Sequence, residues 1–379
     1  MQNRFPSFAS RRAARGTLGA LSLGITAFAA PAPARAQGGV MLQGIADVEL
    51  WKTTRQSLLL ARRDGRLGTV ERLQLWAAAE PMRGVVLYAQ GQVETGPARD
   101  EAGTELYADQ IGVKYSRSAA LVLDVGKMPH PVGEFASRRF SNRNPLVGVP
   151  DGYAVEYPLG AQLSGTRGRV DYRAAVVSLP VFHEGYVPDP SARARPALGG
   201  GFTFAPGVRL GASATWGSYL NCDIPAALLG GRSWQTPQQR VGGLDLQISR
   251  GYLELHGELG ASSSDVPGAA RPAHGLTYYG EAKYTLSPRL FVAGRVERND
   301  YPYIVPADAA HWSSSATNVY NGELGTGFRL TSTTLLKLSA RADRWMVPAA
   351  RRPILPNGGA LAFQLSQSFD VLDLARRRR

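Results

Sequence analysis

Residues 335–345 of this chain alternate between apolar and polar side chains at every second position. A strand places successive side chains on opposite faces, so a period of two predicts a β-strand with one apolar and one polar face. Residues 169–177 and 290–297 repeat the pattern, with full charges on the polar face. In 335–345 the apolar series is Leu336, Leu338, Ala340 and Ala342, and the polar series is Lys337, Ser339, Arg341 and Asp343.

About sixteen segments of the chain follow this rule, and their connections alternate in length. Tight turns of a few residues, such as 206–207 and 287–288, are followed by long loops, such as 127–152 and 300–317. The predicted strands are 40–51, 69–79, 84–95, 104–115, 119–126, 153–165, 169–180, 197–205, 208–217, 240–249, 252–262, 275–286, 289–299, 318–330, 334–345 and 360–372.

This alternation of turns and loops is typical of a barrel that crosses a membrane. After Gln37 no apolar run approaches the ~20 residues of a transmembrane helix, so a spanning chain would have to be a closed barrel. Up-and-down barrels have an even strand number, with tight turns on one side and long loops on the other. We therefore predict an all-β, transmembrane up-and-down antiparallel β-barrel of about 16 strands, or of 14 to 18 if the weak segments 119–126 and 197–205 are misassigned.

A soluble β-sandwich also alternates, which leaves a secreted all-β binding protein as an alternative. Such a protein has less reason to sort its loops by length. A chain of 379 residues would also divide into two or three domains, and no linker divides this one.

Residues 1–36 have the organisation of an export signal. Arginines at the start precede an uncharged, mostly apolar stretch at 16–30, and Ala34-Arg35-Ala36 provides the small-x-small pattern of a cleavage site. The apolar stretch is too short to span a bilayer. We expect cleavage near Ala36, which leaves residues 37–379 as the barrel in the outer membrane of a Gram-negative cell.

Charge and cysteine content exclude several functions. The formal charge of +13 includes five arginines in the signal, so the mature chain carries +8 with both signs mixed along it. It has no basic face with interleaved aromatic residues, so we expect no nucleic-acid partner. Cys222 is the only cysteine, which excludes an intramolecular disulfide and a cysteine-cluster metal site.

In strand pattern, residues 37–379 resemble a bacterial outer-membrane porin of the sixteen-stranded type. Residues 126–133, GKMPHPVG, are also similar to the strand exit G-K-x-x-x-P-x-G of phosphate-selective (O/P-type) porins. The resemblance implies a water-filled channel for passive diffusion of small hydrophilic solutes, surrounded by membrane lipid and able to form a homotrimer. It implies neither enzymatic activity nor a cofactor.

In such porins the connection between the fifth and sixth strands commonly folds into the barrel, and here that connection is 127–152. If it folds inward, its arginines would surround a constriction and favour anions, since charged rings set the selectivity of a pore. The alternative is an exposed loop whose charges are solvated. The predicted constriction residues are Lys127, Glu134, Arg138, Arg139 and Arg143.

The polar faces of the strands would line the channel. Charges of both signs occur there in nearly equal number, so we expect salt bridges between neighbouring strands and little selectivity from the wall itself. The predicted lining residues are Lys114, Arg169, Asp171, Arg173, Glu254, His256, Glu258, Lys283, Arg295, Glu297, Lys337 and Arg341.

Two observations bear on catalysis. Glu254, His256 and Glu258 share one strand face and could bind zinc or act in acid–base chemistry, but residues two apart on a strand project in parallel and do not converge. The other histidines, His274 among them, fall in predicted loops rather than on an outward face. We therefore expect no metal and no catalytic residues. A barrel enzyme and a non-conducting structural or adhesive barrel remain alternatives.

Overall fold

The computed structural model describes residues 39–54, 65, 67–96, 103–150, 157–178, 194–220, 222, 224–301, 304–306, 312–314, 317–346 and 357–372. The predicted signal at 1–36 and its cleavage site lie outside the described residues. No helix in the described part of the chain is long and apolar enough to span a lipid bilayer.

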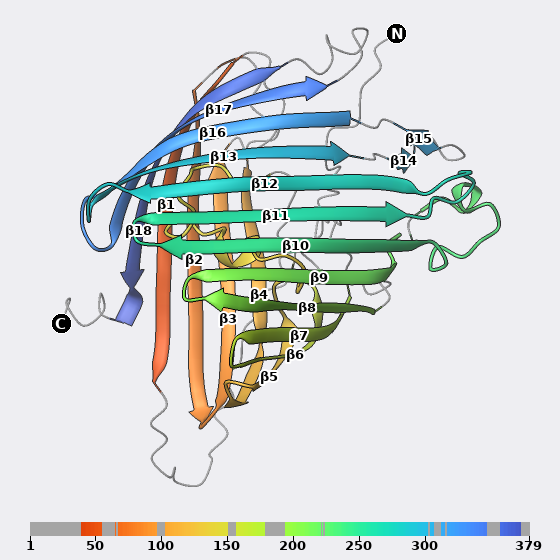
Figure 1. Ribbon diagram of the computed structural model, residues 1–379, viewed down its shortest axis with the longest axis horizontal. Helices are drawn as coiled ribbons and strands as arrows, with labels where there is room; N and C mark the ends of the chain where they lie inside the picture. Colours follow the sequence, from red (N-terminus) through yellow and green to blue (C-terminus); the bar gives the residue numbers. More distant parts are fainter. Residues whose placement is uncertain are drawn as a thin grey trace. The chain divides into compact units, whose positions relative to one another are not determined.

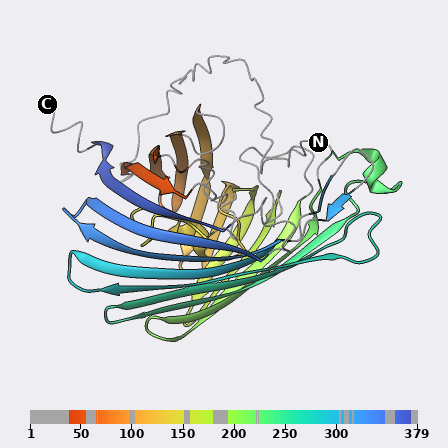
Figure 2. The same cartoon turned by 90° about the horizontal axis from the view of Figure 1, so that it is seen from above.

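Sixteen antiparallel strands form one closed barrel, which confirms the predicted fold class and strand number. Each strand pairs with its neighbours along the chain, and β1 pairs with β18 to close the sheet (Figure 1). In Figure 2 the strands from green to blue form a continuous curved wall. The strands are β1 (Val40–Thr53), β2 (Leu67–Met82), β3 (Val85–Gly96), β4 (Gly103–Ser118), β5 (Leu121–Lys127), β6 (Leu159–Arg167), β7 (Val170–Val177), β8 (Arg195–Ala205), β9 (Val208–Ser218), β10 (Gln238–Arg250), β11 (Leu253–Ser264), β12 (Ala273–Thr285), β13 (Leu290–Tyr301), β16 (Thr317–Arg329), β17 (Thr334–Met346) and β18 (Gly358–Asp370).

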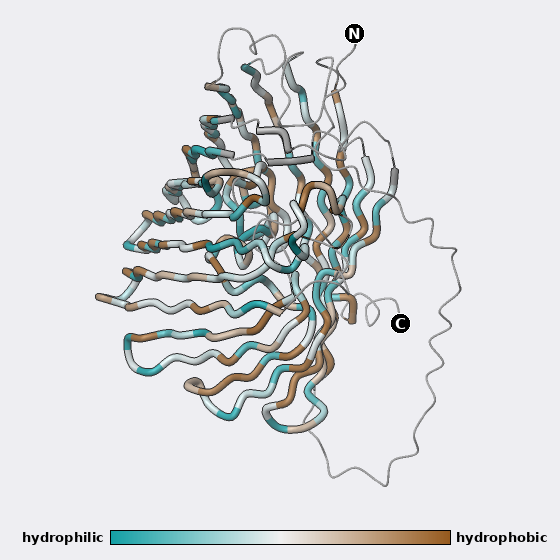
Figure 3. The backbone as a smooth tube through the Cα atoms, turned by 90° about the vertical axis from the view of Figure 1, so that its right-hand side faces the viewer, coloured by the Kyte–Doolittle hydropathy of each residue, from teal (hydrophilic) through white to brown (hydrophobic). Residues whose placement is uncertain are grey.

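The two faces of the barrel differ as the alternation predicts. Along β17, Lys337 and Arg341 face inward and are buried, whereas Leu338 faces outward and is exposed. Brown and teal alternate along many strands of the hydropathy-coloured tube (Figure 3). Exposed Leu, Val, Phe and Tyr side chains dominate the outward face, which is the arrangement of a barrel whose outer surface is solvated by lipid.

Three details of the secondary structure were not predicted. β6 begins at Leu159, later than the predicted segment 153–165, and residues 153–156 lie outside the described residues. A two-stranded hairpin, β14 (Ile304–Pro306) and β15 (Trp312–Ser314), lies within the predicted loop 300–317. Strands this short carry too few residues for a period of two to be visible.

The third detail is a β-bulge in β4. Gln90 of β3 pairs with Gln110, and Gly91 pairs with Ala108, so Asp109 is an extra residue in the ladder. An extra residue reverses the alternation of inward and outward side chains. Tyr107 and Asp109 are therefore buried inside the barrel. Without the bulge, a regular alternation counted back from the inward-facing Lys114 predicts that both face outward.

A glycine in β16 accommodates an aromatic ring of the neighbouring strand. Gly327 pairs with Phe291 of β13, and a Cβ atom at Gly327 would lie 2.0 Å from Cζ of that ring. The Phe291 side chain is buried on the inward face, and the Lys283 ammonium lies 5.3 Å from its ring centroid. The Phe291 ring thus occupies the space that a side chain at residue 327 would need.

We predict that Gly327→Val lowers the temperature at which the folded barrel loses its characteristic fast mobility in gel electrophoresis. Displacing a buried ring costs about 1–3 kcal/mol. Gly280→Val is the matched control, because a Cβ atom at Gly280 meets no atom within 4 Å. Equal unfolding temperatures for the two variants would show that the ring does not depend on this glycine.

Candidate functional site inside the barrel

The connection between β5 and β6 lies against the inward face of the barrel. Its described residues are 128–150 and 157–158, and residues 128–150 contact inward side chains of strands from both halves of the chain. The Ser141 hydroxyl donates to Asp47 Oδ1 of β1 at 2.6 Å, and the Gly148 amide donates to Glu323 Oε1 of β16 at 2.9 Å. We call residues 128–150 the inner loop.

The first part of the inner loop is held by two arginines of the wall. Arg173 of β7 donates to Glu134 Oε1 at 2.7 Å and to the Gly133 carbonyl at 3.0 Å. Arg209 of β9 lies 3.7 Å from the same carboxylate and also pairs with Asp171 at 2.7 Å. Glu134 therefore ties the inner loop to two strands.

A short 3-10 helix, η2 (Phe135–Arg138), forms the next part of the inner loop. Phe135 is buried against Tyr279 of β12, with the rings edge to face and their centroids 5.8 Å apart. Arg138 forms an ion pair with Glu281 of β12. The helix is thus anchored by an apolar contact and a charge pair on the same strand.

Arg139, the next residue, binds a different strand of the barrel wall from Arg138. Arg139 pairs with Asp109 at 2.5 Å, and its guanidinium lies 4.7 Å from the centroid of the Tyr157 ring. Asp109 is the bulged residue of β4. The bulge therefore supplies the carboxylate that neutralises this arginine.

Lys337 of β17 organises the centre of the inner loop. Its ammonium donates to the carbonyls of Ser141, Asn144 and Leu146, each at 2.9 Å, and the side chain is 2 % exposed. An ammonium has three donors and is costly to bury without acceptors. The backbone of the inner loop bends around this group and provides all three.

The last part of the inner loop meets a buried charge network. Arg295 donates to the Gly148 carbonyl at 2.7 Å and pairs with Glu281 at 3.1 Å and with Glu323 at 2.8 Å. Arg341 donates to the Val149 carbonyl at 3.3 Å. The same Glu281 accepts from Arg138, so the network connects the two ends of the inner loop.

Four of the five predicted constriction residues are held in place by polar partners, and three of these four are in ion pairs. Glu134, Arg138 and Arg139 are in the ion pairs described above, and Lys127 is buried in β5, where it donates to the Ala108 carbonyl at 2.5 Å. Arg143 differs, because it is exposed and donates to the Ser137 carbonyl at 3.1 Å. In the described part of the chain no carboxylate lies within salt-bridge distance of Arg143.

Eleven of the predicted lining residues occupy inward positions of the strands. Arg169 does not, and its assignment to the wall is wrong. It lies in the tight turn before β7, is exposed, and donates to the Phe204 carbonyl at 3.4 Å. The residues on the inward face are Lys114, Asp171, Arg173, Glu254, His256, Glu258, Lys283, Arg295, Glu297, Lys337 and Arg341.

Several inward charges were missed. Arg72 of β2 pairs with Glu49 of β1 at 3.1 Å and with Glu94 of β3 at 2.8 Å. Asp47 and Glu49 alternate with Val48 and Leu50, so the parity signal for them was present in the sequence. For Asp109 the alternation in the sequence pointed outward, because the bulge shifts the inward and outward positions of β4 by one residue.

The cluster of Glu254, His256 and Glu258 is part of the wall. Glu254 pairs with Lys283 at 2.6 Å, and Glu258 accepts from the Tyr279 hydroxyl at 2.9 Å. Among the residues that the structure describes, no group of His, Cys, Asp and Glu is arranged to hold a metal ion.

The prediction that His274 lies in a loop is wrong. It is the second residue of β12, faces outward, and pairs across strands with Ser263 of β11. The outward face therefore does carry a Ser and a His side by side. Within the described residues, neither side chain has a hydrogen bond that would align them for nucleophilic catalysis.

A scan against protein-family models and a search of curated proteins find no match to this sequence. Solved structures do match the fold. The anion-selective porin of Comamonas acidovorans superimposes with a TM-score of 0.60 at 11% identity, over 88% of this chain and 100% of that chain. Salmonella typhi OmpF, in complex with daunomycin, gives 0.59 at 10% identity, over 87% and 97%.

The trimer form of OmpT, an outer membrane protein of Vibrio cholerae, gives a TM-score of 0.54 at 11% identity, over 88% of this chain and 99% of that chain. At such low identity these matches concern the fold alone. The fold is that of the sixteen-stranded outer-membrane porins.

We predict that Lys337→Met releases the centre of the inner loop while leaving the barrel closed. Three hydrogen bonds to a charged donor are lost, so hydrogen-exchange protection of the 141–148 amides should fall by about a hundredfold. Lys283→Met is the matched control, since Lys283 is an inward lysine whose ion-pair partner, Glu254, lies on the wall. Equal protection in the two variants would show that Lys337 does not hold the inner loop.

Proposed function

We propose that this protein is an outer-membrane pore through which small hydrophilic solutes diffuse passively. The observation that carries the proposal is the position of the inner loop within a closed barrel that is polar inside and apolar outside. A barrel of sixteen or more strands is too wide for its own side chains to fill, so its lumen holds water. Solutes would move down their gradient, and no bond-making step is needed.

The inner loop would narrow the lumen at a fixed place. It is held to the wall at several points by the ion pairs of Glu134, Arg138 and Arg139. The hydrogen bonds from Lys337 to three of its backbone carbonyls hold its centre. Because these contacts lie on strands on different sides of the barrel, the inner loop would act as a static constriction rather than as a swinging gate. Lys127, Glu134, Arg138 and Arg139 would then position the constriction.

Arg143 would be the constriction residue that solutes meet. It is exposed and has no carboxylate partner among the described residues, whereas Arg138 and Arg139 are neutralised. A guanidinium at a constriction favours anions. We propose a modest anion preference that rests mainly on this one side chain.

A homotrimer would also explain the short strands on one side of the barrel. β5 and β7 have 7 and 8 residues and β6 between them has 9, while a strand that spans a bilayer needs about 9–11. A neighbouring copy would cover the wall where it is too low to match the lipid.

We predict that purified protein in a planar lipid bilayer gives discrete ion-conducting steps, and that Arg143→Glu shifts its ion preference toward cations. Reversing one charge at a wet constriction should change the anion-to-cation permeability ratio by roughly two- to fivefold at low salt, less at high salt.

Arg271→Glu provides the matched control, because Arg271 is exposed in the connection between β11 and β12. A folded barrel that shows no conductance would contradict the channel and favour a structural or adhesive role. Identical selectivity in the two variants would remove Arg143 from the constriction.

A further inference from the structure

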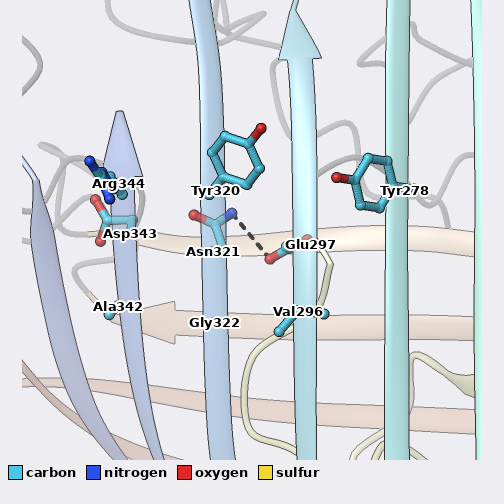
Figure 4. A pocket seen from close by; sticks show the side chains of 9 residues that line it. All are labelled: Tyr278, Val296, Glu297, Tyr320, Asn321, Gly322, Ala342, Asp343 and Arg344. Carbon is cyan, nitrogen blue, oxygen red and sulfur yellow. Dashed lines mark hydrogen bonds between the residues drawn. The ribbon is translucent and has the colours of Figure 1, made fainter. Parts of the chain in front are cut away.

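The outward face of the barrel carries a polar row that the channel does not use. Tyr278, Arg298, Tyr320 and Arg344 lie side by side on β12, β13, β16 and β17, since Tyr278 pairs with Arg298, Arg298 with Tyr320, and Tyr320 with Arg344. Figure 4 shows Tyr278, Tyr320 and Arg344 at one level, above Val296 and Ala342. We call these four residues the outer row.

The row lies near the ends of the strands that lead into the long connections. Arg298 is three residues from the end of β13 at Tyr301, and Arg344 is two residues from the end of β17 at Met346. Long loops of such barrels face the outside of the cell, which places the row at the level of the outer-leaflet headgroups. A lipid-facing arginine costs far less free energy there than at the midplane of the bilayer.

The two arginines differ in what they already bind. Arg298 donates to both oxygens of Asp300, at 2.8 and 3.0 Å, and its guanidinium lies 5.0 Å from the centroid of the Tyr320 ring. Arg344 is exposed, and within the described residues its side chain has neither a hydrogen bond nor an ion pair. The row thus holds two guanidinium groups against one carboxylate, with the donors of Arg344 unused.

A shallow groove runs below the row. It has a volume of about 370 Å³ and is lined by Tyr278, Tyr320 and Arg344 above and by Val296, Gly322 and Ala342 below. The inward-facing neighbours Glu297, Asn321 and Asp343, which are buried, complete its lining. The small residues create it, because a Cβ atom at Gly322 would meet no atom within 4 Å. Beyond the groove the outward face is apolar, with Leu324 71% and Leu338 53% exposed.

We propose that the outer row and this groove bind a phosphorylated, acylated lipid of the outer leaflet. Arg344, supported by Arg298, would bind the phosphate, because a guanidinium matches phosphate oxygens bidentately. The hydroxyls of Tyr278 and Tyr320 lie at headgroup level, as in aromatic belts. An acyl chain would occupy the groove over Gly322.

The combination of charge and shape favours this occupant over a second copy of the chain. An isologous contact through the row would bring Arg298 and Arg344 against the same arginines of the partner, which like charges disfavour. A phosphate above an apolar groove matches both halves of the surface. The inference depends on the barrel spanning the membrane but not on its conducting.

The test uses the full-length barrel, purified in a non-ionic detergent, with binding followed by native mass spectrometry. The probes are lipid A, its dephosphorylated form, and inorganic phosphate. We expect wild-type protein to retain lipid A, to retain the dephosphorylated form about tenfold less, and to show no competition by millimolar phosphate. Arg344→Ala should weaken retention of lipid A by about tenfold or more.

Two further variants separate the parts of the site. Gly322→Leu should weaken retention of lipid A because it fills the groove while leaving both arginines in place. Arg250→Ala should leave retention unchanged, since Arg250 faces outward at the end of β10, on the rim formed by the tight turns. Each variant is first checked for the gel mobility of a folded barrel.

Equal retention of lipid A by Arg344→Ala and Arg250→Ala would overturn the proposal. Displacement of lipid A by phosphate alone would also overturn it, because the site would then recognise a free anion. Conductance of all these variants should equal that of the wild type. A failure of lipid binding is thereby distinguishable from a failure of the channel.

Discussion

The backbone of this chain has to satisfy its own hydrogen bonds, and the closure of the sheet between β1 and β18 achieves this. An open edge in lipid would leave a row of amides and carbonyls without partners, at a cost of several kcal/mol for each group. Closure therefore decides the rest of the architecture. It requires antiparallel neighbours, an even strand number, and side chains that alternate between lipid and lumen.

Closure at sixteen strands creates a second requirement, which the inner loop meets. The lumen is too wide to be packed by the wall, yet the inward face carries buried charges such as Lys337, Arg295 and Glu323. These groups need partners in a setting where unpaired charges are expensive. The backbone carbonyls of the inner loop and its arginines provide them. The contacts that hold the inner loop in place are thus also those that stabilise the wall.

The sequence predicted the strands well because alternation is a local signal that lipid on one face enforces. It predicted the inward position of Lys337 and Arg341 for the same reason. It did not predict what those side chains bind, because the partners of Lys337 are backbone carbonyls almost 200 residues away and depend on how the inner loop bends. Asp109 was missed because one bulged residue reverses parity, and Arg169 because a strand boundary was placed one residue too early.

The central claim is that the inner loop narrows a conducting lumen, and single-channel conductance of a variant lacking residues 134–147 tests it most directly. The comparison is made with wild-type protein in the same planar bilayers, using material that retains the gel mobility of a folded barrel. If the inner loop is the constriction, the variant should conduct more per channel and discriminate less between ions. Unchanged conductance and unchanged ion preference would contradict this explanation of the structure.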